Sequence, residues 1–155
     1  MGILRVCERM SGVLIRRAES NDLHGIFRCI SQMASYKPSM EQHQLIAERF
    51  FSQDWVHAVV AIHRGSHFPD QVIGFASISF EMKIRGGVIG HVEDVVVDGR
   101  WRRRGVGKAL LSALLEESLR RNAYRIYLEC SESNSDFYVS CGFVRSGLSM
   151  SRNLD

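Results

Sequence analysis

Residues 91–108 read HVEDVVVDGRWRRRGVGK, and this stretch decides the fold. Its first part is a β-branched run, broken by the acidic pair Glu93 and Asp94, and it predicts a buried strand. An arginine cluster follows, and then a glycine turn opens the helix-forming sequence KALLSALLEESLRR. The first N–H groups of a helix lack an intrahelical partner, and with the helix dipole they favour an anion. Strand, basic turn and helix in this order therefore predict a pyrophosphate site, with chemistry at the acidic pair beside it.

The composition of the turn supports the same interpretation. Gly105 and Gly107 flank Val106, and the missing Cβ atoms let an anionic group come close to the backbone. Positive charge is supplied by four side chains, Arg100, Arg102, Arg103 and Arg104. A solvated basic patch or a nucleic-acid contact is the alternative for the arginines, but it gives the two glycines no function. We therefore favour a cofactor that carries a pyrophosphate.

The chain has 155 residues, of which 45% are hydrophobic, and a formal net charge of +3. This length fits one domain with a substantial core, so we expect a flexible leader over 1–12 and a single domain over 13–155. The charge excess is small and does not require a nucleic-acid partner. No apolar run could span a membrane, and the first residues lack a secretory pattern. We expect a cytoplasmic protein with no membrane partner.

Cysteines and histidines give no sign of a metal site. The four cysteines are widely spaced and match neither a CxxC metal site nor a compact disulfide framework, so we expect reduced thiols. The six histidines show no metal-ligand spacing, and no metal is expected. His91 lies on the predicted strand of the site, where we expect a hydrogen-bonded core histidine.

Apolar periodicity and turn residues predict a mixed α/β sheet. Strands are expected at 13–17, 55–62, 72–80, 88–97, 124–130 and 143–150. Helices are expected at about 20–34, 39–51, 105–121 and 134–141. The first helix is expected to be capped by Ser20 or Asn21, and the second by a capping box, SMEQ, that begins at Ser39. The order gives antiparallel hairpins early in the chain and a βαβ unit late.

One motif connects this pattern to a known family. RRRGVG, residues 102–107, resembles the acetyl-coenzyme A signature of the GCN5-related N-acetyltransferases (GNAT), which is Gln or Arg, two residues, Gly, one residue, then Gly or Ala. The element order, the valine-rich strand before the motif, and Asn134 and Tyr138 in ESNSDFYVSCGF are also similar to that superfamily. The resemblance implies the GNAT fold, a mixed sheet of about six to seven strands flanked by about four helices.

Four further segments narrow the resemblance. GHVEDVVV, YRIYLEC, FYVSCGF and IRRAESNDL are similar to segments of the GNAT enzymes that act on glucosamine 6-phosphate. The resemblance implies direct transfer of an acetyl group from acetyl-CoA to the sugar amine in a ternary complex, which gives N-acetylglucosamine 6-phosphate on the way to UDP-GlcNAc. It also implies a homodimer in which both subunits contact substrate.

The resemblance assigns the cofactor to the fourth strand and the basic turn. It implies that pantetheine lies along the strand, that one backbone N–H polarises the thioester carbonyl, and that the pyrophosphate rests on the turn. The implied cofactor-binding residues are Val95, Val96, Val97, Arg102, Arg103, Arg104, Gly105, Val106, Gly107, Lys108 and Asn134. Core packing of the valines is the alternative, and both can hold because backbone and side chains face different partners. For Asn134 the alternative is a helix N-cap.

Three residues are implied to carry the chemistry. Glu93 and Asp94 resemble the acidic pair that meets the amino sugar; strand alternation predicts that they point to opposite faces, so only one meets the amine. The alternative is a pair of strand-end carboxylates bound to arginines. Tyr138 is implied to protonate the coenzyme thiolate, which a phenol with a reference pKa of about 10 can do. Its alternative is a core tyrosine.

The sugar phosphate requires cations, and the resemblance points to three segments. The implied substrate residues, besides the acidic pair, are Lys83, Ile84, Arg85, Gly86, Tyr124, Arg125, Glu129 and Arg152. Near the C-terminus, alignment with the family leaves two candidates for the third phosphate contact, Arg152 and Asn153.

Two other functions fit the same sequence less well. A GNAT enzyme that acts on another small amine or on a protein amine would share the cofactor site but differ around the KIRG turn and the EDVVV strand. A basic nucleic-acid-binding module would use the arginine cluster alone and would show steep salt dependence.

Overall fold

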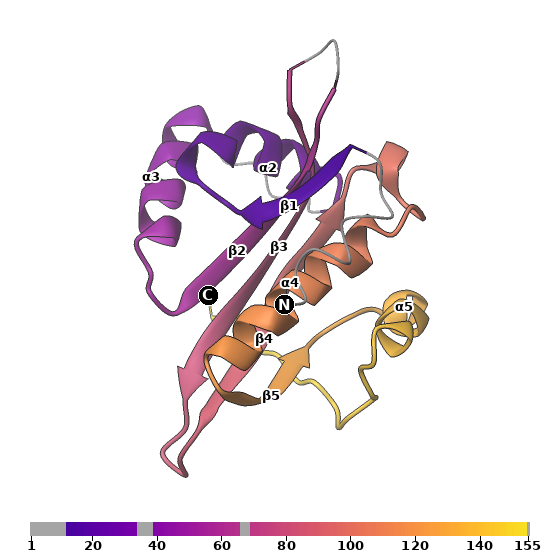
Figure 1. The fold of residues 1–155 in the computed structure, drawn as a ribbon. Helices are drawn as coiled ribbons and strands as arrows, with labels where there is room; N and C mark the ends of the chain where they lie inside the picture. Colours follow the sequence, from indigo (N-terminus) through magenta and orange to yellow (C-terminus); the bar gives the residue numbers. More distant parts are fainter. Residues whose placement is uncertain (1–11, 34–38, 66–68, 155) are drawn as a thin grey trace.

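The computed structural model describes residues 12–33, 39–65 and 69–154. Five strands form one sheet in the order β1-β2-β3-β4-β5 (Figure 1). They are β1 (Val13–Arg17), β2 (Val56–His63), β3 (Gln71–Met82), β4 (Val88–Val97) and β5 (Ala123–Leu128). The helices are η1 (Ser20–Asp22), α2 (Leu23–Ile30), α3 (Met40–Phe51), η2 (Gly99–Trp101), α4 (Val106–Arg120), η3 (Glu132–Asn134) and α5 (Ser135–Ser140).

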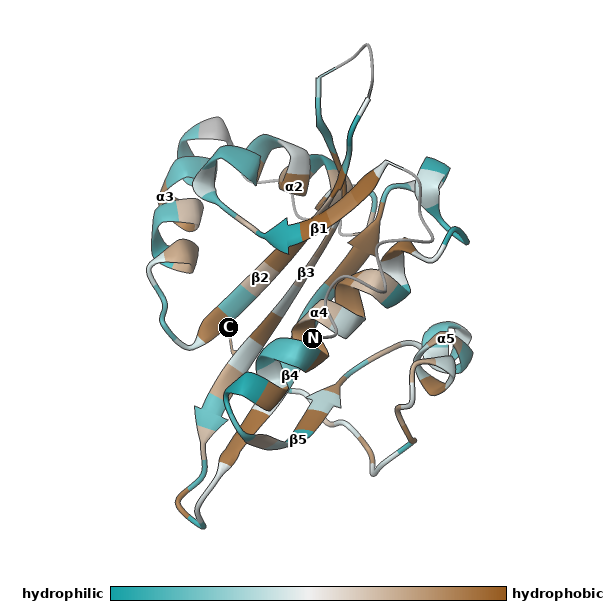
Figure 2. Ribbon diagram, in the orientation of Figure 1, coloured by the Kyte–Doolittle hydropathy of each residue, from teal (hydrophilic) through white to brown (hydrophobic). Residues whose placement is uncertain are grey.

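The sheet is antiparallel from β1 to β4, and β5 joins β4 in parallel. The parallel pair needs a crossover, which α4 supplies. The central strands carry hydrophobic residues along most of their length, whereas the outer side of α3 is largely hydrophilic (Figure 2). This pattern is typical of a sheet that is covered on both faces.

Each face of the sheet has its own core. On one face, the apolar side of α4 packs on β2, β3 and β4 through Val106, Leu110, Leu111 and Leu114. On the other face, α2 and α3 pack through Ile26, Cys29, Phe50 and Phe51 against residues that include Val96. The site strand β4 therefore lies between two apolar layers, which hold its backbone in place.

A buried polar cluster fixes the C-terminal end of α4 to the sheet. Glu117 accepts a hydrogen bond from Arg121 at 2.8 Å and forms an ion pair with Arg120 at 2.7 Å. The buried His57 of β2 lies 3.8 Å from the same carboxylate. Arg121 also donates to the carbonyl of Asp54 at 3.0 Å, so the cluster joins the helix to the start of β2.

The predicted elements are found with two differences. The first helix is split into η1 and α2, and its start is set by Glu19, whose N–H donates to the Asp22 carboxylate at 2.8 Å, instead of by Ser20 or Asn21. The capping box at Ser39 is confirmed: the Ser39 N–H donates a hydrogen bond to the Gln42 side chain, and the Gln42 N–H donates one to the Ser39 hydroxyl. The expected leader falls almost wholly on residues 1–11, which lie outside the described part.

The strand expected at 143–150 is wrong, and among the described residues the sheet has five strands instead of about six to seven. Gly147, inside this segment, has a φ of +71°, which an extended strand does not contain. The apolar side chains of Val144, Leu148 and Met150 are exposed. Alternating apolar residues form a strand only where the edge of a sheet pairs with them. Among the described residues, no strand pairs with 143–150.

No helix in the described ranges combines the length and apolarity that crossing a membrane requires.

Candidate active site

β4 and β5 diverge at the acidic pair. They pair from Val88 to Val92 on β4, and the pairing ends where β5 ends, at Leu128. In the part of the chain that the structure describes, residues 93–97 therefore have no strand partner on the β5 side. Free backbone N–H and C=O groups at such an edge can bind an extended ligand as if it were another strand.

A β-bulge lies at the same point. Ala76 pairs with Val95 and Ile78 pairs with Val92, so Glu93 and Asp94 together oppose the single residue Ser77. Val92 and Val95 both pack in the α4 core, which strict alternation would forbid for residues three apart. The bulge changes the direction in which the side chains point.

Both carboxylates therefore lie on the face opposite α4, and the expectation of opposite faces is wrong. Glu93 accepts a hydrogen bond from the Ser79 hydroxyl at 3.0 Å, and Ser79 points away from the α4 core because its neighbours Ile78 and Phe80 pack in it. Asp94 precedes Val96 by two residues, and Val96 packs in the α2 and α3 core. The bulge thus brings two acids to one place.

The two acids have different environments. Glu93 is exposed and bonded to Ser79, whereas Asp94 is half-buried. Burial raises the pKa of Asp94, and the negative charge of Glu93 raises it further. A carboxylate with a raised pKa is a better proton acceptor near neutral pH, so Asp94 is the stronger candidate for a general base.

The basic turn is held in a shape that leaves the N-terminus of α4 open. Gly105, the N-cap residue, has φ +87° and no side chain to cap the helix, and Arg103 also has a positive φ of +59°. The first helical hydrogen bond runs from Ala109 N–H to the Gly105 carbonyl at 3.0 Å, so the preceding N–H groups lack an intrahelical acceptor. Lys108 is exposed at this end. This arrangement favours an anion.

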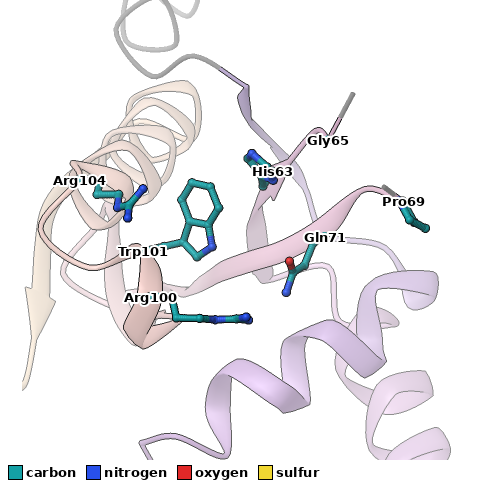
Figure 3. A pocket seen from close by; sticks show the side chains of 7 residues that line it. All are labelled: His63, Gly65, Pro69, Gln71, Arg100, Trp101 and Arg104. Atoms are coloured by element: carbon teal, nitrogen blue, oxygen red, sulfur yellow. The ribbon is translucent and has the colours of Figure 1, made fainter. Parts of the chain in front are cut away.

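The arginines of the cluster do not all face the gap between β4 and β5. Arg102 donates to the Val97 carbonyl at 3.1 Å and so ties the turn to the end of β4. Arg104 lies over the Trp101 ring, 5.1 Å from its centroid, and Arg100 pairs with the buried Asp98. Both line a separate pocket of about 360 Å³ beside the β2–β3 connection (Figure 3). Of the three, only Arg102 forms a hydrogen bond with β4 among the described residues.

Gly107 has a packing function that the sequence interpretation left out. A Cβ atom there would lie 3.1 Å from Cζ of Phe137, so the glycine lets α5 approach the first turn of α4. Gly107 would therefore have a function even in a solvated basic patch, and the expectation that it would have none is wrong. The same contact brings α5, which carries Tyr138, next to the basic turn (Figure 1).

Tyr138 is partly buried against the α4 core and lines a hollow of about 1110 Å³ between β5 and residues 141–149. Burial raises the pKa of its phenol, and Cys130 and Cys141 raise it further, so the phenol stays protonated at neutral pH. Asn134 stands at the N-cap of α5, but its side chain forms no capping bond and is exposed.

Six of the predicted substrate residues lie in the β3–β4 turn or on β5. The KIRG turn is closed by hydrogen bonds from Lys83 N–H to the Gly87 carbonyl, 3.0 Å, and from Gly86 N–H to the Lys83 carbonyl, 2.8 Å. Ile84 and Arg85 are exposed at its tip. Tyr124 packs under the turn, because a Cβ on Gly87 would lie 2.7 Å from its ring. Two segments far apart in the sequence thus meet.

Lys83 begins a polar row on the face that carries the two acids. Lys83 pairs with Glu81 at 2.8 Å, and His91 lies 3.6 Å from the same carboxylate. The His91 ring stacks on Tyr127, whose hydroxyl accepts a hydrogen bond from Arg125 at 3.3 Å. His91 is partly exposed, so the expectation of a core histidine is wrong.

The C-terminal candidates lie apart from this row in the contacts of the described residues. Glu129 accepts a hydrogen bond from Ser149, which ties β5 to the C-terminal segment. Arg152 and Asn153 are exposed, and neither side chain has a hydrogen bond or ion pair within 12–33, 39–65 and 69–154. Over the same ranges, no group of three His, Cys, Asp or Glu side chains is arranged to bind a metal ion.

Ser77, Ser79 and Glu81 are the residues that sequence reasoning missed. The signal was present in GFASISFEM, where polar residues occupy every second position of a strand. Such alternation predicts one polar face, and it is the face that bears Glu93 and Asp94.

Comparisons with known proteins agree with this geometry. The model of the acetyltransferase (GNAT) family matches residues 22–143. A glucosamine 6-phosphate N-acetyltransferase of Dictyostelium discoideum is 31% identical over 147 residues, 90% of this chain and 90% of that protein. The crystal structure of glucosamine-6-phosphate N-acetyltransferase from Arabidopsis thaliana is similar with a TM-score of 0.82 at 28% identity, over 92% of this chain and 99% of that one.

A third protein shares the fold at lower identity. An aminoglycoside N-acetyltransferase solved in complex with CoA has a TM-score of 0.78 at 20% identity, over 95% of this chain and 97% of that chain. The family match covers most of the chain and includes β2 to β5, the bulge and the basic turn. The chain belongs to the acetyltransferase (GNAT) family.

Proposed function

We propose that this chain transfers the acetyl group of acetyl-CoA to the amine of glucosamine 6-phosphate. The observation that carries the proposal is the free edge of β4, which runs from two carboxylates on one face to the open N-terminus of α4. The relatives from Dictyostelium discoideum and Arabidopsis thaliana, which bear the name of that activity, support the substrate.

The residues present fit acetyl-CoA as a substrate. The backbone of Val95–Val97 has no β5 partner among the described residues, although the Val97 carbonyl accepts from Arg102, and this edge suits pantetheine. One N–H there would polarise the thioester carbonyl. The N–H groups from Gly105 to Lys108, with Arg102 and Lys108 nearby, suit the pyrophosphate. Asn134, at the N-cap of α5, is a further contact in this proposal.

In the reaction, the amine nitrogen forms a bond to the acetyl carbon while the carbon–sulfur bond breaks. Only a neutral amine can attack, so Asp94 accepts its proton and the exposed Glu93 attracts the ammonium form before that step. The departing thiolate takes a proton from Tyr138, which burial keeps protonated, and the phenolate regains a proton through solvent. The nitrogen loses its second proton to solvent as the amide forms, so the one net proton released is the one that Asp94 accepted. The raised pKa values of Asp94 and Tyr138 support these two assignments.

The sugar phosphate is assigned to the KIRG turn and β5. Lys83, Arg85 and Arg125 supply the positive charge, and Tyr124 packs under the turn that carries the first two. Arg152 or Asn153 supplies a third contact in this proposal, and Glu129 orients the segment that bears them. A homodimer with contributions from both subunits and a cytoplasmic location are parts of the same proposal.

A panel of amines tests the substrate. With acetyl-CoA fixed, we expect kcat/KM for glucosamine 6-phosphate to exceed that for glucosamine by at least about 100-fold, because two or three charge-assisted bonds to phosphate are lost with glucosamine. A rate for glucosamine 6-phosphate no better than for glucosamine, or a higher rate with a peptide amine, would contradict the assignment. Sedimentation of the chain tests the homodimer separately.

A further inference from the structure

Ser77 of β3 is a buried hydroxyl without a hydrogen-bond partner. Its side chain is 1% exposed, and its Oγ accepts and donates no hydrogen bond among the residues that the structure describes. Buried hydroxyls in folded proteins nearly always have a partner, because an unmade bond costs free energy. An exception next to a reaction site indicates a group whose partner is a water molecule or a charged side chain of that site.

The register places Ser77 opposite the bulge. Its neighbours on β3, Ala76 and Ile78, pair with Val95 and Val92, so Ser77 alone faces the two acidic residues between them. Ala76 and Ile78 point into the α4 core, and Ser77 therefore points to the opposite face, which Glu93 and Asp94 share.

The choice between the two acids follows from their existing bonds. Glu93 is already bonded by Ser79, the next residue of the same polar row, at 3.0 Å. Asp94 accepts no side-chain hydrogen bond from the described residues, and it is half-buried like the hydroxyl that faces it. Residues directly opposite each other on neighbouring strands have Cβ atoms about 4.5–5.5 Å apart, a gap that a χ1 rotation or one water closes.

We propose that Ser77 is a positioning residue of the acetyl-transfer site, whose hydroxyl donates to the Asp94 carboxylate, directly or through one water, and aims it at the substrate amine. This inference rests on the proposed function. Ser77 itself touches no substrate, since it lies in the interior of the sheet. It acts by holding the base in its charged form and in one orientation.

The proposal predicts the sign of a change in pH dependence. A hydrogen bond donated to a carboxylate favours the charged form and lowers its pKa. Removing the hydroxyl therefore raises the pKa of Asp94, and the acid limb of the kcat/KM profile moves to higher pH. For a charge-assisted bond we expect a shift of about one pH unit or more.

The test compares Ser77→Ala with the natural chain in pH profiles with acetyl-CoA and glucosamine 6-phosphate. We expect the upward shift, a reduced kcat at neutral pH, a KM for acetyl-CoA within about twofold, and a slightly lower melting temperature at neutral pH, because the bond to the charged carboxylate is lost. Ser118→Ala is the matched control, because Ser118 is also 1% exposed but its hydroxyl is bonded to the Leu114 carbonyl of its own helix at 2.8 Å. That variant should leave the profile unchanged.

Two further measurements keep the proposal falsifiable. An NMR titration of the Asp94 carboxyl in the free enzyme should show the same upward shift in Ser77→Ala, and it needs no activity. An unshifted Asp94 in that variant, or in Ser77→Cys if the alanine variant does not fold, would overturn the role of Ser77. If the natural chain is folded but does not acetylate glucosamine 6-phosphate, the proposed function is overturned. The titration would still show whether Ser77 bonds to Asp94.

Discussion

At the scale of single residues, the acidic pair shows how local context separates two similar side chains. Glu93 and Asp94 are adjacent in sequence and share a face, but one is exposed and bonded to a serine while the other is half-buried. Burial and the neighbouring charge raise the pKa of Asp94. Sequence alone could name the pair but could not rank its members, because the ranking depends on what covers each side chain.

Asp94→Asn removes the proposed base without changing the size of the side chain. We expect kcat/KM to fall by about 10²–10⁴-fold, the usual range for loss of a general acid or base, with the KM for acetyl-CoA little changed. Steady-state kinetics measures both. Asp70→Asn, an exposed aspartate before β3, is the control. Retention of more than about a tenth of the activity in Asp94→Asn would show that another group accepts the proton.

At the scale of elements, α4 carries a structural function at each end. Its first turn combines the open N-terminus with the Gly107 contact to α5, and its last turn is fixed to β2 by Glu117. The arginine and glycine pattern predicted the open end correctly in outline. The close approach of Phe137 was not predictable, since it requires knowing where a short helix later in the chain is placed.

Gly107→Ala tests the contact between α4 and α5. The added Cβ would lie 3.1 Å from the Phe137 ring, so we expect α5 to shift and the affinity for acetyl-CoA, measured by calorimetry, to fall by about tenfold, or about 1.4 kcal/mol. Combining it with Phe137→Leu should restore much of the loss. Gly99→Ala is the control, because the nearest atom to its Cβ would be a side-chain oxygen at 3.6 Å. An unchanged affinity in Gly107→Ala would argue against a packing function.

The cluster at the other end of α4 predicts a pH-dependent stability. Burial lowers the pKa of His57 more than Glu117 raises it, so the 3.8 Å contact joins a neutral imidazole to the carboxylate. The unfolded chain binds this proton at about pH 6.5, and the folded chain binds it only at lower pH. The stability from neutral His57 is therefore present above about pH 6.5 and is lost as the pH falls below that value.

Urea unfolding at a series of pH values checks this behaviour. We expect the unfolding free energy to fall between about pH 6.5 and 5 in the natural chain and to change less in His57→Gln. His24→Gln, which alters an exposed histidine, should follow the natural chain. Parallel curves for the natural chain and His57→Gln would contradict the prediction.

At the scale of the whole molecule, most of the fold was predictable because its signals are local. Inspection of the sequence identifies the spacing of apolar residues in β1 to β5 and α2 to α5. It also identifies the capping box at Ser39 and the RRRGVG turn. The bulge was not predictable, since it depends on which residues of β3 oppose β4. The strand expected at 143–150 failed for a related reason: alternation in one segment does not reveal whether an edge is available to it.

Binding of acetyl-CoA should stabilise the whole domain, because in the proposed site the ligand joins β4 to the start of α4. At about 100 times the dissociation constant we expect about 2.7 kcal/mol, which corresponds to a rise of about 5–10 °C in melting temperature. A thermal-shift measurement tests this, and Arg102→Ala should reduce the rise because Arg102 ties the turn to Val97. No rise with acetyl-CoA, together with a steep salt-dependent response to nucleic acid, would favour the basic-module interpretation.

The bulge at Glu93 and Asp94 has a consequence for how this strand can vary. Because two residues stand opposite one, removing either acid would leave Val92 and Val95 two positions apart and restore regular pairing with β3, so that Val95, Val96 and Val97 would keep their present layers. The interior would tolerate the deletion, but only one carboxylate would remain at this place. The extra residue of β4 therefore serves the chemistry of the site and not the packing of the core.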